Sequence, residues 1–311
     1  MKKKDGISVV IPNWNGKQLL KANLPHLIKE MENYGGDNEI IIVDDASTDG
    51  SPRFIRDTYP FVRVLELKQR QGFPIAANQG VTESKYDMVL LLNSDITVER
   101  DFLSPLLNYF DDEKTFAVSN KAMKDENTAL TRPHIMEFKW GFFRERYISK
   151  ENDASFAFGA SGGHGLFDRR KFIQLGGFDE LYSPFYYEDA DLSYRAWKRG
   201  YRVYFEPNSI VYHEHQASIG KAFSAAYIRF VSKRNNFIFL WKNLTDFDFL
   251  LQHVIFLPFY LLLNSVRNPL LFLSLLGALI RLPLILKARK KEKGFVRYGD
   301  RDILALMKGR L

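Results

Sequence analysis

The sequence contains no cysteine among its 311 residues. This absence excludes disulfide bonds, thiolate metal sites and cysteine nucleophiles, and it fits a reducing compartment. Stretches of low complexity are also missing, and the shares of hydrophobic residues (46%) and charged residues (26%) are close to those of ordinary folded proteins. The composition therefore predicts a globular enzyme with a sizeable buried core.

A signal peptide and a dinucleotide-binding loop are both missing from the amino-terminal segment. The apolar run at residues 7–12 is too short for the core of a signal peptide, so we expect the chain to stay in the cytosol. No Gly-x-Gly-x-x-Gly motif follows this run, where the chain has Pro12-Asn-Trp-Asn-Gly16. The sequence therefore argues against a dinucleotide-binding oxidoreductase.

The net positive charge of the chain comes from its tail. Residues 281–311 contain ten Lys or Arg and three acidic residues, a net charge of +7. The net charge of the whole chain is also +7. Apolar runs at 254–263, 269–280 and 282–286 lie beside these basic residues, and each is shorter than the roughly 18–20 residues of a spanning helix. We therefore expect a helical region that lies on an anionic membrane surface, peripheral or monotopic at the cytoplasmic face.

The tail has two other possible roles. The helices could only pack on the rest of the protein or form a dimer interface, and the sequence leaves this open. Nucleic acid is not an expected partner, because the basic residues adjoin apolar helices and are not interleaved with aromatic residues that would stack on bases.

Short apolar runs alternate with amphipathic stretches over the first 120 residues. Runs at 7–12, 39–43, 62–67 and 88–92 are rich in Val, Ile and Leu and predict buried strands. Five apolar residues between the first two runs share one helical face: Leu20, Leu24, Leu27, Ile28 and Met31. This alternation predicts an α/β fold with a mostly parallel sheet flanked by helices.

Less regular segments follow. Residues 121–155 predict a flexible segment that crosses the site, and Gly159-Ala-Ser-Gly-Gly163 predicts either a plain turn or a close approach to a ligand.

Polar residues follow the predicted strands at their carboxyl ends. Since ligands of such sheets bind beyond these ends, the polar residues are expected to converge on one site. Asp95 suits a divalent cation that neutralises a diphosphate, although it could instead cap a helix over residues 96–108. The polar residues in question are Asn13, Asn15, Asp44, Asp45, Asn93, Ser94 and Asp95.

Two further clusters carry candidate chemistry. Glu188 and Asp189 follow three aromatic residues at a predicted helix start, where shielding from water tunes a general base. With Asp191, they could instead form only a favourably charged first helical turn. His213 and His215 share one face of a predicted strand and could bind a metal or merely contact backbone carbonyls.

Taken in order, these segments resemble the family 2 glycosyltransferases of the GT-A fold, over roughly residues 6–220. Residues 8–15 are similar to the opening strand of that family, and residues 42–51 to its nucleotide-binding signature. Leu92-Asn-Ser-Asp95 is similar to a variant of its metal motif that keeps only the last acid. Gly176-Gly-Phe-Asp-Glu180 and Glu188-Asp-Ala-Asp-Leu192 are similar to its acceptor-side signature.

The resemblance implies an inverting transfer of a sugar from a nucleotide-diphosphate donor to an acceptor hydroxyl. Asp189 would be the general base with Glu188 beside it, and Asp95 would hold Mg or Mn with His213, while His215 is the less favoured ligand. Asn93 stands where the family has the first metal-motif acid, and Arg70 departs from its Asn-x-Gly-Phe pattern. The implied nucleotide-binding residues are Pro12, Asn13, Asn15, Asp44, Asp45, Arg70 and Asn93.

The chain is accordingly divided into a GT-A catalytic domain at residues 1–225 and an apolar and basic helical region at 226–311. The tail favours a lipid-linked saccharide acceptor in cell-surface polysaccharide synthesis, and the Asn-Ser-Asp pattern suggests a deoxysugar donor such as rhamnose. A sugar nucleotidyltransferase is the first alternative, although only Gly16-Lys17 stands where its triphosphate loop would be. A non-catalytic nucleotide-sugar binder attached to the membrane is the second.

Overall fold

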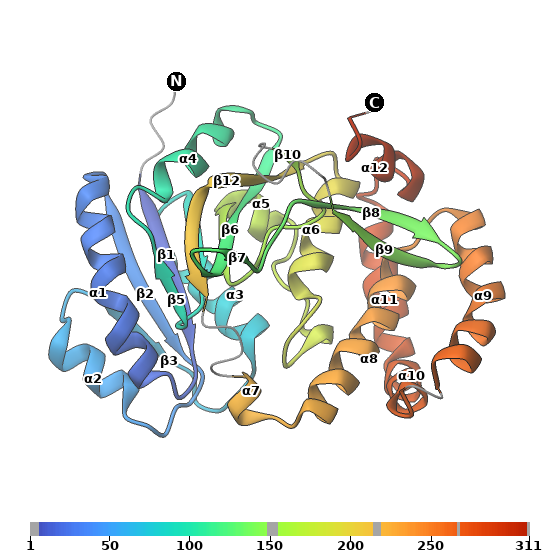
Figure 1. Cartoon of the computed structure of the whole chain (residues 1–311), viewed down its shortest axis with the longest axis horizontal. Coiled ribbons are helices and arrows are strands. Elements are labelled where there is room, and N and C mark those ends of the chain that lie inside the picture. Colours follow the sequence, from blue (N-terminus) through green and yellow to red (C-terminus); the bar gives the residue numbers. More distant parts are fainter. Residues whose placement is uncertain (1–5, 148–154, 214–218, 266–267, 310–311) are drawn as a thin grey trace.

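A computed structural model describes residues 6–147, 155–213, 219–265 and 268–309. Within these residues, ten strands form one sheet in the order β10-β12-β6-β11-β4-β1-β2-β3, with β5 paired to β12 and β7 to β6. Two more strands form a separate hairpin. The sheet lies on the left in Figure 1 and the carboxyl-terminal helices lie on the right.

Four parallel strands form the first half of the sheet, where the apolar runs predicted them. Three helices connect them, and each returns the chain to the edge of the sheet at which the next parallel strand begins. The strands are β1 (Ile7–Asn13), β2 (Asn38–Asp44), β3 (Arg63–Glu66) and β4 (Met88–Leu92), and the helices are α1 (Lys17–Tyr34), α2 (Ser51–Thr58) and α3 (Phe73–Glu83).

Hydrophobic clusters cover both faces of this sheet. Because successive side chains of a strand point to opposite faces, Ile7 and Val9 of β1 pack in the cluster that contains Leu20 of α1, whereas Val10 packs in the cluster that contains Ala77 of α3. Of the predicted α1 face, Ile28 is only partly buried and the other four residues are buried. The predicted α/β fold with helices on both faces of the sheet is confirmed.

The second half of the sheet contains antiparallel pairs. β11 runs antiparallel between β4 and β6, while β6 and β12 are parallel. The elements are β5 (Ile96–Val98), α4 (Leu103–Leu107), a 3-10 helix (Asn108–Asp111), β6 (Thr115–Asp125), β7 (Thr128–Ala129), β10 (Ser155–Phe156), β11 (His164–Asp168), α5 (Arg169–Gln174), a 3-10 helix (Glu180–Tyr182), α6 (Glu188–Lys198) and β12 (Arg202–His213).

The segment after Asp95 is a strand and not a helix. Ile96 and Val98 are buried and pair with the end of β12, so the interpretation of Asp95 as a cap for a helix over residues 96–108 is wrong. Pairing with a strand from far along the chain overrides the local helical pattern here.

The expected irregular segment at 121–155 is largely ordered strand in its described part. β8 (His134–Lys139) and β9 (Phe142–Tyr147) form an antiparallel hairpin. Its aromatic rings pack on a carboxyl-terminal helix, with ring centroids 4.2 Å apart both for Phe138 and Phe249 and for Phe142 and Tyr260. The prediction of a flexible segment is therefore wrong for residues 134–147, because aromatic burial fixes the hairpin in place.

Helices make up the rest of the described chain. α8 packs against α6, α10 and α11. α10 and α11 are bent by 60° relative to each other. The helices are α7 (Ile219–Ala222), α8 (Ala225–Asn243), α9 (Phe247–Ser265), α10 (Leu270–Ile280), α11 (Leu282–Lys293) and α12 (Asp300–Leu306).

α9 corrects the expectation that every apolar helix of the tail is too short to span a membrane. It runs unbroken for 19 residues with a mean hydropathy of 1.4, and 11% of its apolar window is buried. By length and composition alone, α9 is the one described helix that reaches the dimensions of a membrane span, and the bent pair α10 and α11 would be a second.

Candidate active site

A cavity of about 270 Å³ opens beyond the carboxyl ends of β1, β4 and β12. Strand ends, the loop after β3 and the start of α6 all contribute to its wall. The polar residues that follow the strands therefore converge as expected. Nine predicted site residues line the cavity: Pro12, Asn13, Asp45, Arg70, Asn93, Asp95, Glu188, Asp189 and His213.

The other two predicted residues, Asp44 and Asn15, are outside this lining. Asp44 accepts hydrogen bonds from the Asn13 amide at 2.8 Å and from the Ser47 hydroxyl at 2.6 Å. The Asn15 side chain accepts one from the backbone N–H of Thr48 at 2.8 Å. Both residues brace the loops that end β1 and β2, and so shape the cavity from behind.

Asn13 presents an unused acceptor to the cavity. Its amide nitrogen is held by Asp44, whereas its buried Oδ1 has no hydrogen-bond partner in the described part of the chain. Gly16 follows closely, and a Cβ at that position would stand 2.3 Å from Asn13 Oδ1. A buried acceptor without a partner is costly, so this atom is available to a ligand donor.

Asp45 and Arg70 meet where the loop after β3 reaches the cavity. The Asp45 carboxylate accepts the backbone N–H groups of Gln71 at 2.6 Å and Gly72 at 2.8 Å, which fixes the loop. The Arg70 guanidinium carbon lies 3.3 Å from the ring centroid of Trp14 and 4.9 Å from that of Phe223. Burial lowers the pKa of Arg70 from its ordinary value, yet the group stays cationic at neutral pH.

Sequence reasoning missed the two aromatic residues that hold Arg70. Trp14 stands between Asn13 and Asn15, and an apolar ring inside a polar loop was a usable signal. Phe223 follows α7, far along the chain, and no sequence pattern connected it to the site. Stacking on both rings holds the Arg70 guanidinium in the wall of the cavity.

Asp95 and His213 lie side by side in the cavity wall. β5 pairs antiparallel with β12 so that His213 stands opposite Ile96, and the His213 Nε2 atom lies 3.3 Å from Asp95 Oδ1. Buried His164 of β11 lies behind, with its ring centroid 6.3 Å from that of His213. Burial, with a smaller effect of His213, lowers the pKa of His164 to about 3, so that its ring is neutral.

The Asp95 and His213 side chains could hold a divalent cation only if a bound ligand supplied the rest of its coordination shell. Among the residues that the structure describes, no group of three or more His, Cys, Asp or Glu is arranged to hold a metal. One carboxylate and one imidazole in contact nevertheless match a cation whose remaining ligands are phosphate oxygens and water. His215 lies outside the described residues.

Asn93 and the glycine stretch are in direct contact in the wall of the cavity. Asn93 donates its backbone N–H to the carbonyl of Gly163 at 2.8 Å, and a Cβ at Gly163 would stand 2.4 Å from the Asn93 amide. Ser161, Gly162 and Gly163 all line the cavity. Absence of a side chain at 163 therefore allows this close approach.

Glu188 and Asp189 open α6 and also line the cavity. The Glu188 Oε2 atom is buried without a hydrogen-bond partner among the described residues. Asp189 accepts N–H groups from Ala190 at 2.7 Å and from Gly162 at 3.4 Å. Burial raises the pKa of both carboxyls, and the charge of Asp189 raises the pKa of Glu188 further, so the pair favours a single negative charge.

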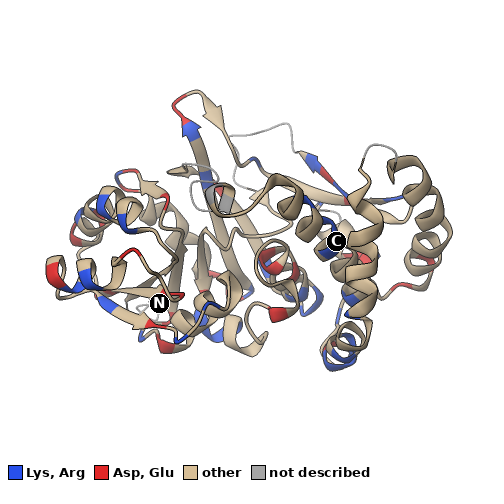
Figure 2. Cartoon of the chain, turned by 90° about the horizontal axis from the view of Figure 1, so that it is seen from below, with Lys and Arg blue, Asp and Glu red and all other residues tan. Residues whose placement is uncertain are grey.

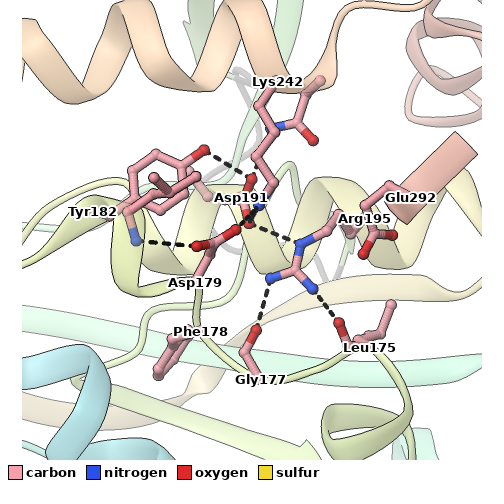
Figure 3. Close-up of polar contacts among 12 residues, drawn as sticks. Leu175, Gly177, Phe178, Asp179, Tyr182, Asp191, Arg195, Lys242 and Glu292 are labelled. Carbon is pink, nitrogen blue, oxygen red and sulfur yellow. Dashed lines mark hydrogen bonds and ion pairs between the residues drawn. The ribbon is translucent and has the colours of Figure 1, made fainter. Parts of the chain in front are cut away.

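Asp191 has a different role from its two neighbours. It is fully buried, and its carboxylate accepts hydrogen bonds from Arg195 at 2.8 Å, Lys242 at 2.8 Å and Tyr182 at 2.8 Å (Figure 3). Although burial opposes ionisation, the two cations hold the pKa of Asp191 well below its usual range. Asp191 therefore joins α6 to α8, while Glu188 and Asp189 face the cavity.

The loop before α6 is held by two residues of α8 that sequence reasoning also missed. The Asn235 amide donates to the carbonyls of Tyr182 at 2.8 Å, Phe185 at 3.0 Å and Tyr186 at 2.8 Å. Arg234 donates to the carbonyl of Ser183 at 2.7 Å. These contacts support a backbone that enters α6 through two residues of positive φ, Tyr186 and Tyr187. No sequence signal connected α8 to the site.

Comparison with protein families decides what kind of enzyme has this site. The model of the family Glycosyl transferase family 2 matches residues 8–176, which is more than half of the chain. The chain belongs to this family. The family match favours glycosyl transfer over the alternatives of a nucleotidyltransferase and of a non-catalytic binder.

Relatives of known name are distant in sequence but alike in fold. The poly-beta-1,6-N-acetyl-D-glucosamine synthase of Staphylococcus aureus is 25% identical over 65% of this chain and 48% of its own length. The chain spans less than half of the curated relatives that it matches first.

Two solved structures cover nearly the whole chain. The mannosyltransferase PcManGT of Pyrobaculum calidifontis, in complex with GDP-Man and Mn2+, has a TM-score of 0.55 and 16% identity over 99% of this chain and 85% of its own. The Staphylococcus aureus TarS fragment 1–349 with UDP-GlcNAc has a TM-score of 0.61 and 15% identity over 98% and 88%. The chain therefore shares the GT-A fold with both.

Proposed function

We propose that this glycosyltransferase moves a hexosyl group from a nucleotide-diphosphate donor to an acceptor hydroxyl with inversion at the anomeric carbon. One observation carries the proposal: the Asp95–His213 pair, the Glu188–Asp189 pair, Asp45 and Arg70 all line a single cavity. A sugar in this cavity would have its diphosphate on one side and a base on the other.

Asp189 is the proposed general base. It would take the proton of the acceptor hydroxyl as that oxygen attacks the anomeric carbon from the face opposite the diphosphate. The bond from the sugar to the diphosphate breaks in the same step, so no sugar–enzyme bond forms. The raised pKa of Asp189 suits this task, because a base works best when its pKa approaches the working pH. Glu188 would stay protonated and donate a hydrogen bond to the acceptor or sugar.

Asp95 and His213 are the residues that would hold Mg or Mn beside the donor diphosphate. When bound, such a cation neutralises charge that develops on the leaving diphosphate. The proposal is supported by the 3.3 Å contact between the two side chains and by the Mn2+ named with PcManGT. Arg70 would add a fixed positive charge on the same side of the cavity.

The nucleotide would lie against the loops that end β1 and β2. Pro12 and Asp45 would contact the base, with Asn13 Oδ1 as an unused acceptor and Asn93 toward the sugar. Asp44 and Asn15 would act by bracing these loops. The neighbouring structures hold GDP-Man and UDP-GlcNAc, and a deoxysugar such as rhamnose is our hypothesis for this chain.

Assay of a panel of nucleotide sugars tests the proposed reaction. Donor hydrolysis and transfer would be measured with Mn2+, with Mg2+ and with a chelator, for the wild-type chain and for Asp95→Ala. We expect the wild-type chain to turn over one donor, and this turnover to require the cation. Asp95→Ala should lose the cation-dependent turnover. NMR of the product should show the inverted anomer, and retention of configuration would refute the single displacement.

The acceptor is proposed to be a lipid-linked saccharide at the cytoplasmic face of the membrane, as in cell-surface polysaccharide synthesis. α9, α10 and α11 carry large apolar side chains that are exposed to solvent. Among them, Phe259, Leu263 and Ile280 are 59%, 73% and 71% exposed, a costly arrangement in water for which a bilayer surface is the natural partner. The domain at residues 1–225 would then carry out the transfer, and the helical region at 226–311 would attach it to the membrane.

A further inference from the structure

A second cavity, of about 610 Å³, lies between α6, α8 and α11 and is separate from the active site. It shares no lining residue with the first cavity. Of its thirteen lining residues, one is acidic, Glu292, and seven are cationic. The cationic residues are Arg195, Lys198, Arg199, Lys242, Arg289, Lys290 and Lys293.

Carboxylates behind the wall neutralise only part of this charge. Four of the cations have acidic partners: Arg195 and Lys242 pair with Asp191, Lys198 with Asp300, and Arg199 with Glu292. The other three cations are Arg289, Lys290 and Lys293. Within the described part of the chain, none of them forms an ion pair with an acidic residue. Figure 2 shows this concentration of Lys and Arg on the helix at the lower right, next to the almost uncharged α9 at the right edge.

Two arginine side chains in the wall, Arg199 and Arg289, have hydrogen-bond donors that lack a strong acceptor. The Arg199 Nε atom is buried and has no hydrogen-bond partner within the described ranges. Arg289 donates only to the backbone carbonyl of Trp241, at 3.0 Å, and burial lowers the pKa of its guanidinium. A buried N–H without an acceptor costs free energy, and so does a half-buried cation whose compensating carboxylate, Asp300, is not in ion-pair contact. An anion in the cavity would reduce both costs.

We propose that this cavity binds a phosphate ester. Guanidinium groups match phosphate oxygens geometrically, and Arg289 and Arg199 would contact the anion while Lys290 and Lys293 neutralise it. The exposed Leu286 lies on the same lining, at the end of the apolar part of α11. The phosphate can therefore belong either to a lipid headgroup or to a soluble ester, and the site does not depend on the proposed transfer reaction.

α11 itself offers a matched control. Lys287 and Lys291 lie on the same helix but line a different cavity, on the side of Gly176 and Asp179. The double variants Lys290→Gln/Lys293→Gln and Lys287→Gln/Lys291→Gln therefore lose the same charge from the same helix. Arg289→Gln adds a variant that removes the guanidinium from the wall.

Binding would be measured with two probes on the full-length chain. Calorimetry with glycerol 3-phosphate tests a soluble ester, and co-sedimentation with phosphatidylcholine vesicles, with and without phosphatidic acid, tests a lipid headgroup. Saturable binding of either probe is expected, weakened about tenfold by Lys290→Gln/Lys293→Gln and by Arg289→Gln, and unchanged in the control. Binding of vesicles alone would assign the lipid, and binding of the soluble ester would assign a metabolite.

Two results would overturn the proposal. One is the absence of saturable binding of either probe by the wild-type chain. The other is an equal loss in both double variants, which would show only general attraction to a basic helix. Thermal unfolding of each variant separates loss of binding from loss of fold, and donor hydrolysis in parallel separates this site from the active site.

Discussion

Asp95 Oδ1 lies 3.3 Å from His213 Nε2, because β5 pairs antiparallel with the last residues of β12. This pair has only two protein ligands to offer a cation, so removal of one should be felt strongly. For His213→Ala we expect the Mn2+ concentration for half-maximal donor hydrolysis to rise about 10- to 100-fold. His26→Ala, which removes an exposed histidine of α1, is the control. An unchanged Mn2+ requirement in His213→Ala would exclude His213 as a ligand.

Asp189→Asn should separate binding from chemistry. The amide keeps the shape of the carboxyl but accepts no proton, so kcat should fall about 10²- to 10⁴-fold. Donor binding, measured by calorimetry with the nucleoside diphosphate, should change little because the nucleotide side of the cavity is untouched. Glu180→Gln changes an exposed acid in the 3-10 helix that precedes α6 and should retain activity. Retention of wild-type kcat in Asp189→Asn would assign the base elsewhere.

Glu188 should make stability depend on pH. Its pKa is raised by burial and by Asp189, so the folded state binds its proton more tightly than the unfolded chain does. The associated stability is present below the ordinary carboxyl pKa and is lost as pH rises toward the raised value. Glu188→Gln removes this loss, so its melting temperature relative to the wild type should be higher at pH 8 than at pH 4.5. An equal difference at both pH values would contradict the raised pKa.

Asn235 should matter for both stability and rate. Asn235→Ala leaves three loop carbonyls without their common donor, which should lower the free energy of unfolding by about 2–4 kcal/mol. Since the loop leads directly into Glu188, kcat at saturating donor should also fall. Urea unfolding and initial rates give the two quantities. Asn208→Ala, at an exposed position, should change stability by less than about 0.5 kcal/mol.

The exposed face of α9 should control association with vesicles. Phe259 and Leu263 are 59% and 73% exposed, and burial of each in a bilayer surface is worth about 1.5–3 kcal/mol. Phe259→Gln/Leu263→Gln should therefore weaken co-sedimentation with phosphatidylglycerol vesicles by at least about tenfold. Phe61→Gln/Ile173→Gln removes two exposed apolar residues that lie outside the tail and serves as the control. Equal binding by both double variants would argue against the α9 face.

Local patterns in the sequence determined the first half of the sheet and the family. β1, β2 and β4 appear as short runs of Val, Ile and Leu, because a strand buried on both faces has few polar positions. The prediction of a buried strand is wrong for β3, which lies at the edge of the sheet with Arg63 and Glu66 exposed. Asp45, Asp95 and Asp189 were also found from sequence, since polar residues at strand and helix ends stand out against apolar runs. Their membership in one site could be expected from the rule that parallel strands end at the same edge.

Only the tertiary structure decided which of these side chains face the cavity. Asp189 and Asp191 are alike in sequence, yet Asp191 lies under Lys242 and Arg195, because α8 packs on the buried side of α6. The register of β5 on β12 brings His213 to Asp95. Contacts between segments far apart in the chain also placed Phe223, Asn235 and the hairpin over residues 134–147. Such contacts depend on packing in three dimensions, and no periodicity within one segment records them.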